Sequence, residues 1–176
     1  MPVTRLNHAV LYVRNAARSA AFYRLVLGFR VVGEMAAGQA LFLQAPASTN
    51  DHDLGLFEVG DTADASGAGQ SSVGLYHLAW EVDTLDELER IAGKLSAAGA
   101  FVGSADHGTT KALYASDPDG LELEISWLVP ADQLLPDVTV GVAPLDLVRD
   151  KQRYGGSTRG GIGISTPADP AATLAG

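Results

Sequence analysis

Cysteine is absent from the 176-residue chain, and this absence removes several classes of function at once. Without thiols the protein can form no disulfide, no thiolate metal site and no cysteine nucleophile. A chain of this composition is expected in the reducing cytoplasm. Any metal it binds must be held by imidazole, carboxylate or other oxygen ligands.

Long apolar runs are missing as well. No stretch approaches the roughly 18 residues that a membrane-spanning helix needs. The opening residues, MPVTRLNHAVLYV, lack the basic region and long apolar core of a secretory signal. We therefore expect no membrane partner. The hydrophobic fraction of 47% and a mean hydropathy of +0.11 still predict a packed globule.

Basic residues are scarce, with 12 Lys and Arg against 21 Asp and Glu, which gives a net charge of -9. Such a chain repels phosphate backbones and anionic lipid, so nucleic acid is not an expected partner. The local exception is a basic group near the C-terminus, in and beside a Gly-rich stretch, and we expect it to be a solvated arm. Its members are Arg149, Lys151, Arg153 and Arg159.

An internal repeat organises the rest of the chain. Residues 6–13 (LNHAVLYV) and 75–82 (LYHLAWEV) both fit L-x-H-x-x-x-x-V, with His8 and His77 69 residues apart. Each segment favours a strand and is followed by a helical pattern that ends at a glycine suited to a left-handed cap. The expected helices are Arg14–Leu27 and Thr84–Ala98, and the glycines are Gly28 and Gly99.

Three short strand-like pieces follow each helix, so the sequence predicts two βαβββ units, about 5–60 and 74–129. Two units of this size share a core, which indicates an α+β fold with one curved mixed sheet. Residues 1–130 form this domain, and 131–176 form a C-terminal tail. The expected strands are Phe29–Gly33, Ala40–Gln44, Asp53–Val59, Phe101–Gly103, Lys111–Ala115 and Leu121–Leu128.

The repeated histidines carry the first chemical signal. If the units are related by a pseudo-two-fold axis, His8 and His77 point into the same concavity. The segment DPDGLELEI, residues 117–125, adds a Pro-Gly turn and a strand whose acidic side chains share one face. Two imidazoles and one carboxylate form a facial ligand triad with open metal positions. By alternation alone, either Glu122 or Glu124 supplies the carboxylate.

These motifs resemble the vicinal oxygen chelate superfamily, and within it the type I extradiol ring-cleaving dioxygenases. The resemblance covers about residues 5–129. It implies that His8, His77 and Glu124 bind Fe(II), or alternatively Mn(II), since the family's ligand Glu is the fourth residue after the glycine of D-P-x-G. The implied reaction is cleavage of a small catechol-type aromatic diol by O2.

Further matches assign the remaining site residues by the same resemblance. His52 in His52-Asp53-Leu54 matches the family's acid–base catalyst, and Tyr114 stands ten residues before the ligand Glu, where the family has its Tyr. His107 matches a substrate-binding histidine upstream of that Tyr. The chain departs from the family at Leu121 and Glu122, where Asn and Arg are usual. It also lacks an extra N-terminal domain, which favours a homodimer, as do the apolar residues within 134–147.

Two rival functions stay open. A glyoxalase-I-like isomerase or lyase of the same superfamily takes a fourth protein ligand from the last strand of the first unit. Aligning Asp117–Ile125 with Asn50–Glu58 places apolar Phe57 opposite Glu124, although a register slip would bring Glu58 there. The other rival is a non-catalytic antibiotic-binding resistance protein of the bleomycin-binding type, in which the ligands are generally lost.

Overall fold

The computed structural model describes residues 2–3, 5–134 and 138–161. In these residues the chain divides into two units. Unit 1 runs to Tyr76 and includes the turn Ser116–Leu121, while unit 2 contains His77–Ala115 and the described residues from Glu122 onward. None of the helices in the described parts of the chain is both long and apolar enough to cross a membrane.

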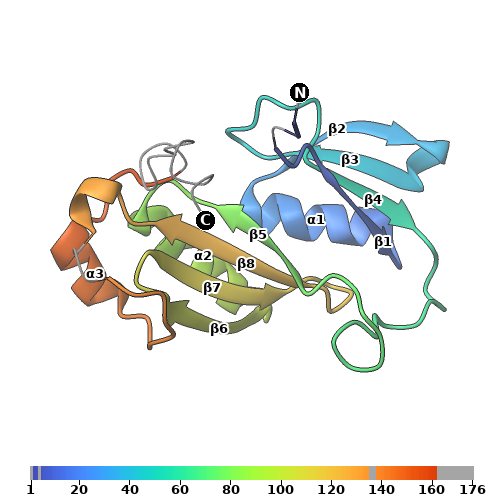
Figure 1. Cartoon of the computed structure of the whole chain (residues 1–176). Coiled ribbons are helices and arrows are strands. Elements are labelled where there is room, and N and C mark those ends of the chain that lie inside the picture. Colours follow the sequence, from blue (N-terminus) through green and yellow to red (C-terminus); the bar gives the residue numbers. More distant parts are fainter. Residues whose placement is uncertain (1, 4, 135–137, 162–176) are drawn as a thin grey trace. The chain divides into compact units, whose positions relative to one another are not determined.

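Unit 1 is a four-stranded mixed sheet with one long helix against it (Figure 1). The strand order is β1-β4-β3-β2, with β1 parallel to β4 and the other neighbours antiparallel. Its elements are β1 (Ala9–Val13), α1 (Ala16–Leu27), β2 (Arg30–Met35), the short 3-10 helix η1 (Ala36–Gly38), β3 (Ala40–Gln44) and β4 (Leu54–Glu58).

Unit 2 repeats the same order of elements, with the sheet β5-β8-β7-β6 and β5 parallel to β8. The α+β class and the two βαβββ units are therefore confirmed, and each unit carries its own four-stranded sheet. Its first five elements are β5 (His77–Glu81), α2 (Leu85–Ala97), β6 (Phe101–Asp106), β7 (Thr110–Ser116) and β8 (Glu122–Leu128).

Local sequence signals begin and end both long helices. The Asn15 side chain accepts a hydrogen bond from the Arg18 backbone N–H at the start of α1, and Thr84 caps α2 in the same way through Glu87 N–H. Gly28 and Gly99 follow the helices with φ of 80° and 65°, as expected for left-handed caps. The caps therefore place the helix ends without help from distant residues.

The buried face of α2 agrees with its periodicity, because Leu85, Leu88, Ile91 and Leu95 are all buried. In α1 the apolar residues divide between the buried and the exposed faces. Ala17, Ala21 and Leu25 are exposed, and the buried positions are Ala16, Ser19, Ala20, Tyr23, Val26 and Leu27. The Ala-rich sequence of α1 gives little contrast between its faces, so the strands of unit 1 decide which face is covered.

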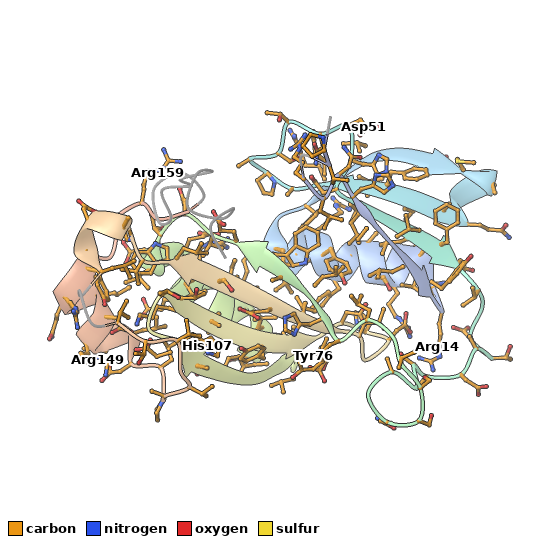
Figure 2. The ribbon with its side chains drawn as sticks, in the orientation of Figure 1. Arg14, Asp51, Tyr76, His107, Arg149 and Arg159 are labelled. Carbon is orange, nitrogen blue, oxygen red and sulfur yellow. The ribbon has the colours of Figure 1, made fainter. Side chains whose placement is uncertain are left out.

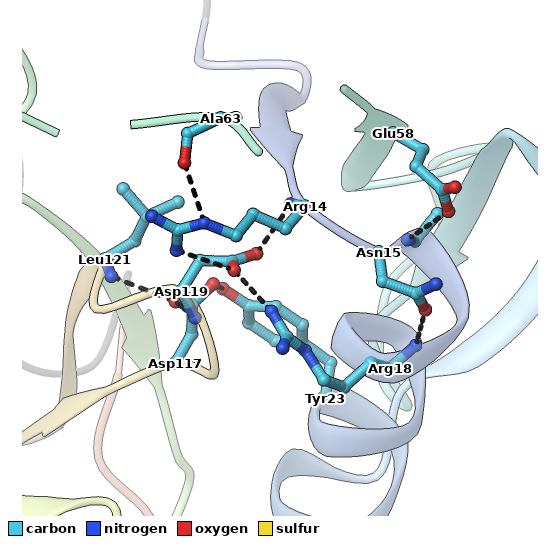
Figure 3. A network of polar contacts seen from close by, with 10 residues as sticks. Arg14, Asn15, Arg18, Tyr23, Glu58, Ala63, Asp117, Asp119 and Leu121 are labelled. Carbon is cyan, nitrogen blue, oxygen red and sulfur yellow. Dashed lines mark hydrogen bonds and ion pairs between the residues drawn. The ribbon is translucent and has the colours of Figure 1, made fainter. Parts of the chain in front are cut away.

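The turn before β8 is held by a polar network in unit 1 (Figure 3). Asp117 accepts hydrogen bonds from the N–H groups of Asp119 (2.8 Å) and Leu121 (2.9 Å). The Asp119 carboxylate accepts hydrogen bonds from the backbone N–H of Arg14 (3.0 Å) and from the Arg14 guanidinium (3.2 Å), and it also pairs with Arg18. Burial raises the pKa of the Asp117 carboxyl. Burial, together with the nearby Asp117 charge, raises the pKa of the Tyr23 hydroxyl.

The described part of the C-terminal segment contains the 3-10 helix η2 (Ala131–Gln133) and helix α3 (Leu147–Tyr154), which contacts α2. The expected solvated arm is wrong for Arg149 and Lys151. Arg149 pairs with Asp106 (3.1 Å) and Asp150 (3.0 Å), and Lys151 pairs with Asp86 (2.7 Å) and Glu89 (2.6 Å). Residues 135–137 and 162–176 of the expected tail lie outside the described residues.

Asp119→Ala should destabilise the fold by about 2 kcal/mol, because it leaves two arginines without the carboxylate that they share. The estimate lies between the values for exposed and buried ion pairs, since Asp119 is 6% exposed and Arg18 is 47% exposed. Urea unfolding followed by circular dichroism measures the change. The exposed Asp61→Ala is the matched control and should shift stability by less than about 0.5 kcal/mol. Equal effects of the two variants would contradict the structural role of the turn.

Asp106 should make stability fall in acid. Burial acts to raise its pKa, but the hydrogen bonds from Lys111 and Gly108 N–H and the charges of Lys111 and Arg149 outweigh it, so the pKa is lowered. A lowered pKa in the folded state adds stability that is complete above the ordinary Asp pKa of about 3.9 and is lost as pH falls through the folded value. The stability difference between the native chain and Asp106→Asn, measured by urea unfolding, should be about 2 kcal/mol at pH 7 and shrink below about pH 4. A difference that stays constant down to pH 2 would contradict this assignment.

Candidate metal and catalytic site

His77 and Glu124 lie next to each other in unit 2. His77 begins β5 and Glu124 lies in the parallel neighbour β8, and the distance between His77 Nε2 and Glu124 Oε2 is 3.2 Å. Both side chains are largely buried, with 25% and 14% of their surface exposed. The other carboxylate oxygen of Glu124 accepts a hydrogen bond from the Ser126 hydroxyl at 2.5 Å. The imidazole and the carboxylate therefore present adjacent donor atoms in a fixed orientation.

Strand alternation explains why Glu124 lies on the side of His77. Leu123, Ile125 and Trp127 fill the buried core of unit 2, which turns Glu122 and Glu124 to the opposite face of β8. Glu122 is exposed, although it is the register partner of His77. The carboxylate that approaches the imidazole is thus two residues further along the strand.

This pair fits a divalent metal ion. Two ligand atoms that are each about 2.1 Å from one ion and at right angles lie about 3 Å apart, close to the distance between Nε2 and Oε2. A hydroxyl that orients the ligating carboxylate is a usual outer contact of such a site. Among the described residues, no three His, Asp or Glu side chains form a group that could hold a metal. His8 belongs to unit 1, so the set of three ligands stays a prediction.

In unit 1 the structure brings His8 and His52 together. Their ring centroids are 4.5 Å apart, although the residues are far apart in sequence. His8 precedes β1 and is exposed, while His52 precedes β4 and has 18% of its side chain exposed. The parallel pairing of β1 with β4 places the two segments side by side, with Ala9 opposite Leu54. A predicted metal ligand and the predicted acid–base residue therefore share one place in this unit.

His52 has two further neighbours that the sequence did not indicate. Its Nδ1 lies 3.2 Å from Asp51 Oδ2, and the Phe42 ring meets it edge-on with centroids 5.1 Å apart. Asp51 lies in the loop before β4 (Figure 2), and its exposed carboxylate has a lowered pKa, chiefly because it accepts a hydrogen bond from the His52 backbone N–H. A carboxylate beside Nδ1 orients the imidazole.

A pocket of about 320 Å³ opens beside this imidazole. Its lining combines apolar groups with one imidazole and one carboxylate, a composition that suits a small, mostly apolar molecule with polar substituents. The lining residues are Val32, Gly33, Phe42, Asp51 and His52. The sequence offers no signal for the first three, because they come from neighbouring strands whose pairing only the fold defines.

His107 and Tyr114 form a hydrogen-bonded pair in unit 2. His107 Nε2 lies 2.8 Å from the Tyr114 hydroxyl, and the opposite ring nitrogen, Nδ1, lies 2.7 Å from the Gly141 carbonyl oxygen. The Tyr114 ring also lies near His77, with centroids 6.2 Å apart. The structure therefore groups four of the six residues expected at the site in unit 2 and the other two in unit 1.

Strand pairing corrects the sequence alignment of the two units. Val10 pairs with Gly55 in unit 1, and the repeat-equivalent Ala79 pairs with Glu124 in unit 2. Gly55, not Phe57, is therefore the counterpart of Glu124. It has no side chain and cannot bind a metal. Glu58 is the residue that a register slip would have placed opposite Glu124 as a fourth ligand. Its side chain instead accepts a hydrogen bond from the backbone N–H of Ala16 (3.0 Å) at the start of α1.

Comparison with known proteins shows the family to which this fold belongs. Residues 5–125 match the family model described as the Glyoxalase/Bleomycin resistance protein/Dioxygenase superfamily, and the chain belongs to that superfamily.

Two curated relatives are similar to the chain. The Catechol-2,3-dioxygenase of Bacillus subtilis (strain 168) is 32% identical over 123 residues, which are 69% of this chain and 41% of the relative. Metapyrocatechase 2 of Cupriavidus necator is 29% identical over 139 residues, 75% of this chain and 40% of that protein. The chain thus spans about two fifths of the length of these relatives.

A solved structure supports the fold. The glyoxylase/bleomycin resistance protein/dioxygenase domain from Frankia sp. EAN1pec aligns with a TM-score of 0.57 and 21% identity, covering 71% of this chain and 98% of that one. At this identity the likeness concerns the fold alone.

Glu124→Ala should abolish stoichiometric binding of a divalent metal, because it removes the carboxylate that faces His77. Glu122→Ala is the matched control on the same strand face and should leave metal content unchanged. Inductively coupled plasma mass spectrometry after Fe(II) or Mn(II) loading and desalting measures both. Metal retained in Glu124→Ala and lost in Glu122→Ala would overturn the assignment of the ligand.

Proposed function

We propose that this protein is an extradiol ring-cleaving dioxygenase that acts on a catechol-type aromatic diol with O2. The observation that carries the proposal is the contact between His77 and Glu124, the two predicted ligands in unit 2, beside the hydrogen-bonded pair of Tyr114 and His107. Similarity to two catechol-cleaving relatives over more than two thirds of this chain supports it.

The metal in this proposal is Fe(II), with Mn(II) as the alternative, and its ligands are His8, His77 and Glu124. Two neutral imidazoles and a carboxylate suit a divalent ion of intermediate softness. Bound there, the ion would lower the pKa of the diol hydroxyls and hold the diol beside O2. Three protein ligands would leave further coordination positions for the two substrates.

His52 is the proposed acid–base residue. An imidazole can accept a proton from a diol hydroxyl and return it later in the cycle. The Asp51 carboxylate at Nδ1 leaves Nε2 as the atom that exchanges the proton with substrate. Phe42 and the rest of the pocket lining offer an apolar surface for the aromatic ring.

Tyr114 and His107 act on the polar side of the substrate. The Tyr114 hydroxyl is the proposed hydrogen-bonding partner of a substrate oxygen, and His107 holds that hydroxyl in place through Nε2. Because both groups belong to the unit that carries His77 and Glu124, they support the substrate beside the metal ligands.

The glyoxalase-I-like alternative needs a fourth protein ligand in the first unit, and Gly55 at the position equivalent to Glu124 argues against it. The non-catalytic alternative is disfavoured by the retained imidazoles and carboxylate.

A homodimer and a cytoplasmic location remain proposals. Exposed Val140, Val142 and Val148 in the C-terminal segment favour a partner that covers them.

Anaerobic loading with Fe(II), followed by a panel of catechols in air, should produce a yellow ring-fission product that absorbs visible light. His52→Phe should lower kcat about 100-fold or more, the size of a lost general acid–base contribution, while metal content stays stoichiometric. Retained metal controls for folding and for the ligands. Unchanged turnover in His52→Phe would remove the acid–base assignment. Turnover of a glutathione hemithioacetal without turnover of any catechol would replace the proposed reaction by isomerisation.

A further inference from the structure

We propose that residues 138–143 are a positioning element of the site. In this proposal the backbone carbonyl of Gly141 sets the ring tautomer of His107 and so directs the Tyr114 hydroxyl. The catalytic consequence rests on the proposed function, whereas the hydrogen-bonding claim stands on the geometry of unit 2 alone. The segment lies beyond residue 125, where the match to the superfamily ends.

The chemistry of the two contacts of His107 defines the tautomer. A backbone carbonyl oxygen can only accept a hydrogen bond, so the contact of 2.7 Å requires a proton on His107 Nδ1. A neutral imidazole carries one N–H, which leaves Nε2 as an acceptor. The contact of 2.8 Å at Nε2 is therefore a hydrogen bond donated by the Tyr114 hydroxyl.

The segment is fastened to the backbone on both sides of His107. Asp106 and Ala143 exchange two backbone hydrogen bonds, of 2.8 Å and 2.9 Å, as a short antiparallel bridge. On the other side, Gly108 has a φ of +81°, and a Cβ added there would lie 2.7 Å from the Thr139 carbonyl oxygen. Only a glycine therefore permits this close approach of the two backbones.

Helix α3 adds a further restraint, because Arg149 binds the Asp106 carboxylate at 3.1 Å (Figure 2 labels Arg149 and His107). Asp106 and Gly108, the sequence neighbours of His107, thus both contact the C-terminal segment, and the His107 ring contacts it through Gly141. In the proposed reaction, the Tyr114 hydroxyl already donates its proton to His107 before substrate arrives, which leaves the Tyr114 oxygen to accept a hydrogen bond from a substrate hydroxyl.

The decisive measurement is a long-range ¹H–¹⁵N correlation spectrum of the full chain at a pH where the imidazoles are neutral. The four histidines are assigned by single substitutions, with His107→Gln identifying the relevant ring. We expect His107 to show the Nδ1–H pattern, and Tyr114→Phe to keep it, because the Gly141 carbonyl remains. An Nε2–H pattern in the native chain, or its appearance in Tyr114→Phe, would overturn the proposal.

A matched pair of glycine variants tests the positioning role. Gly108→Ala forces a Cβ against Thr139 and should convert the His107 signal largely to the Nε2–H form and lower kcat for catechol cleavage about tenfold. Gly99→Ala carries the same strain of a positive φ, +65°, but meets nothing within 4 Å, and should change neither readout. A His107 signal that is equally Nδ1–H in both variants would refute the role of the segment. Failure of every catechol, with the Nδ1–H signature intact, would reject the reaction and support the hydrogen-bonding claim.

Discussion

Parallel pairing of the first and last strands in each unit is the constraint on which the candidate site depends. A parallel neighbour requires a long crossover, here a helix and two further strands, so it joins segments that are more than 40 residues apart. In unit 2 this pairing brings His77 to Glu124, and in unit 1 it brings His8 to His52. His8 and His52 lie just before their strands, His77 begins β5, and Glu124 lies within β8.

Charged groups secure the two segments that flank the strand of Glu124. Before β8, the Asp117-Pro-Asp-Gly turn is bound to the arginines of unit 1. After β8, the C-terminal segment is bound to unit 2 by a cluster around Lys111, which is only 2% exposed. Its ammonium group contacts Asp106, lies 3.9 Å from Asp150 and faces the Tyr154 ring at 5.5 Å. A buried ammonium is tolerated here because carboxylates and an aromatic face compensate its lost hydration.

The C-terminal segment changes how the chain is understood. Its basic residues, its prolines and its glycines suggest a solvated extension, yet its described part completes unit 2 with helix α3 and a backbone bridge to Asp106. Composition could not reveal this, because Arg149 and Lys151 each find an acid on another element. Lys151 reaches α2, for example, and Arg149 reaches the end of β6. The same segment supplies the Gly141 carbonyl next to His107.

Local chemistry was enough to predict much of the fold. The repeat around His8 and His77, the capping glycines Gly28 and Gly99, and the alternation along residues 121–127 are local signals, so the sequence alone determined the two βαβββ units and the buried face of β8. The same alternation places Glu122 and Glu124 on one face of the strand, so it does not distinguish which of the two carboxylates is the ligand. The family resemblance, not the residue pattern, favoured Glu124.

Only the tertiary structure decided the rest. The counterpart of Glu124 is Gly55 and not Phe57, because hydrogen-bond register between strands sets equivalence and sequence spacing around a loop does not. The Phe42 contact of His52, the covered face of α1 and the binding of the segment 138–143 all depend on elements distant in sequence. Such contacts are chosen by packing and charge pairing in three dimensions, and for that reason they leave no periodic pattern in the chain.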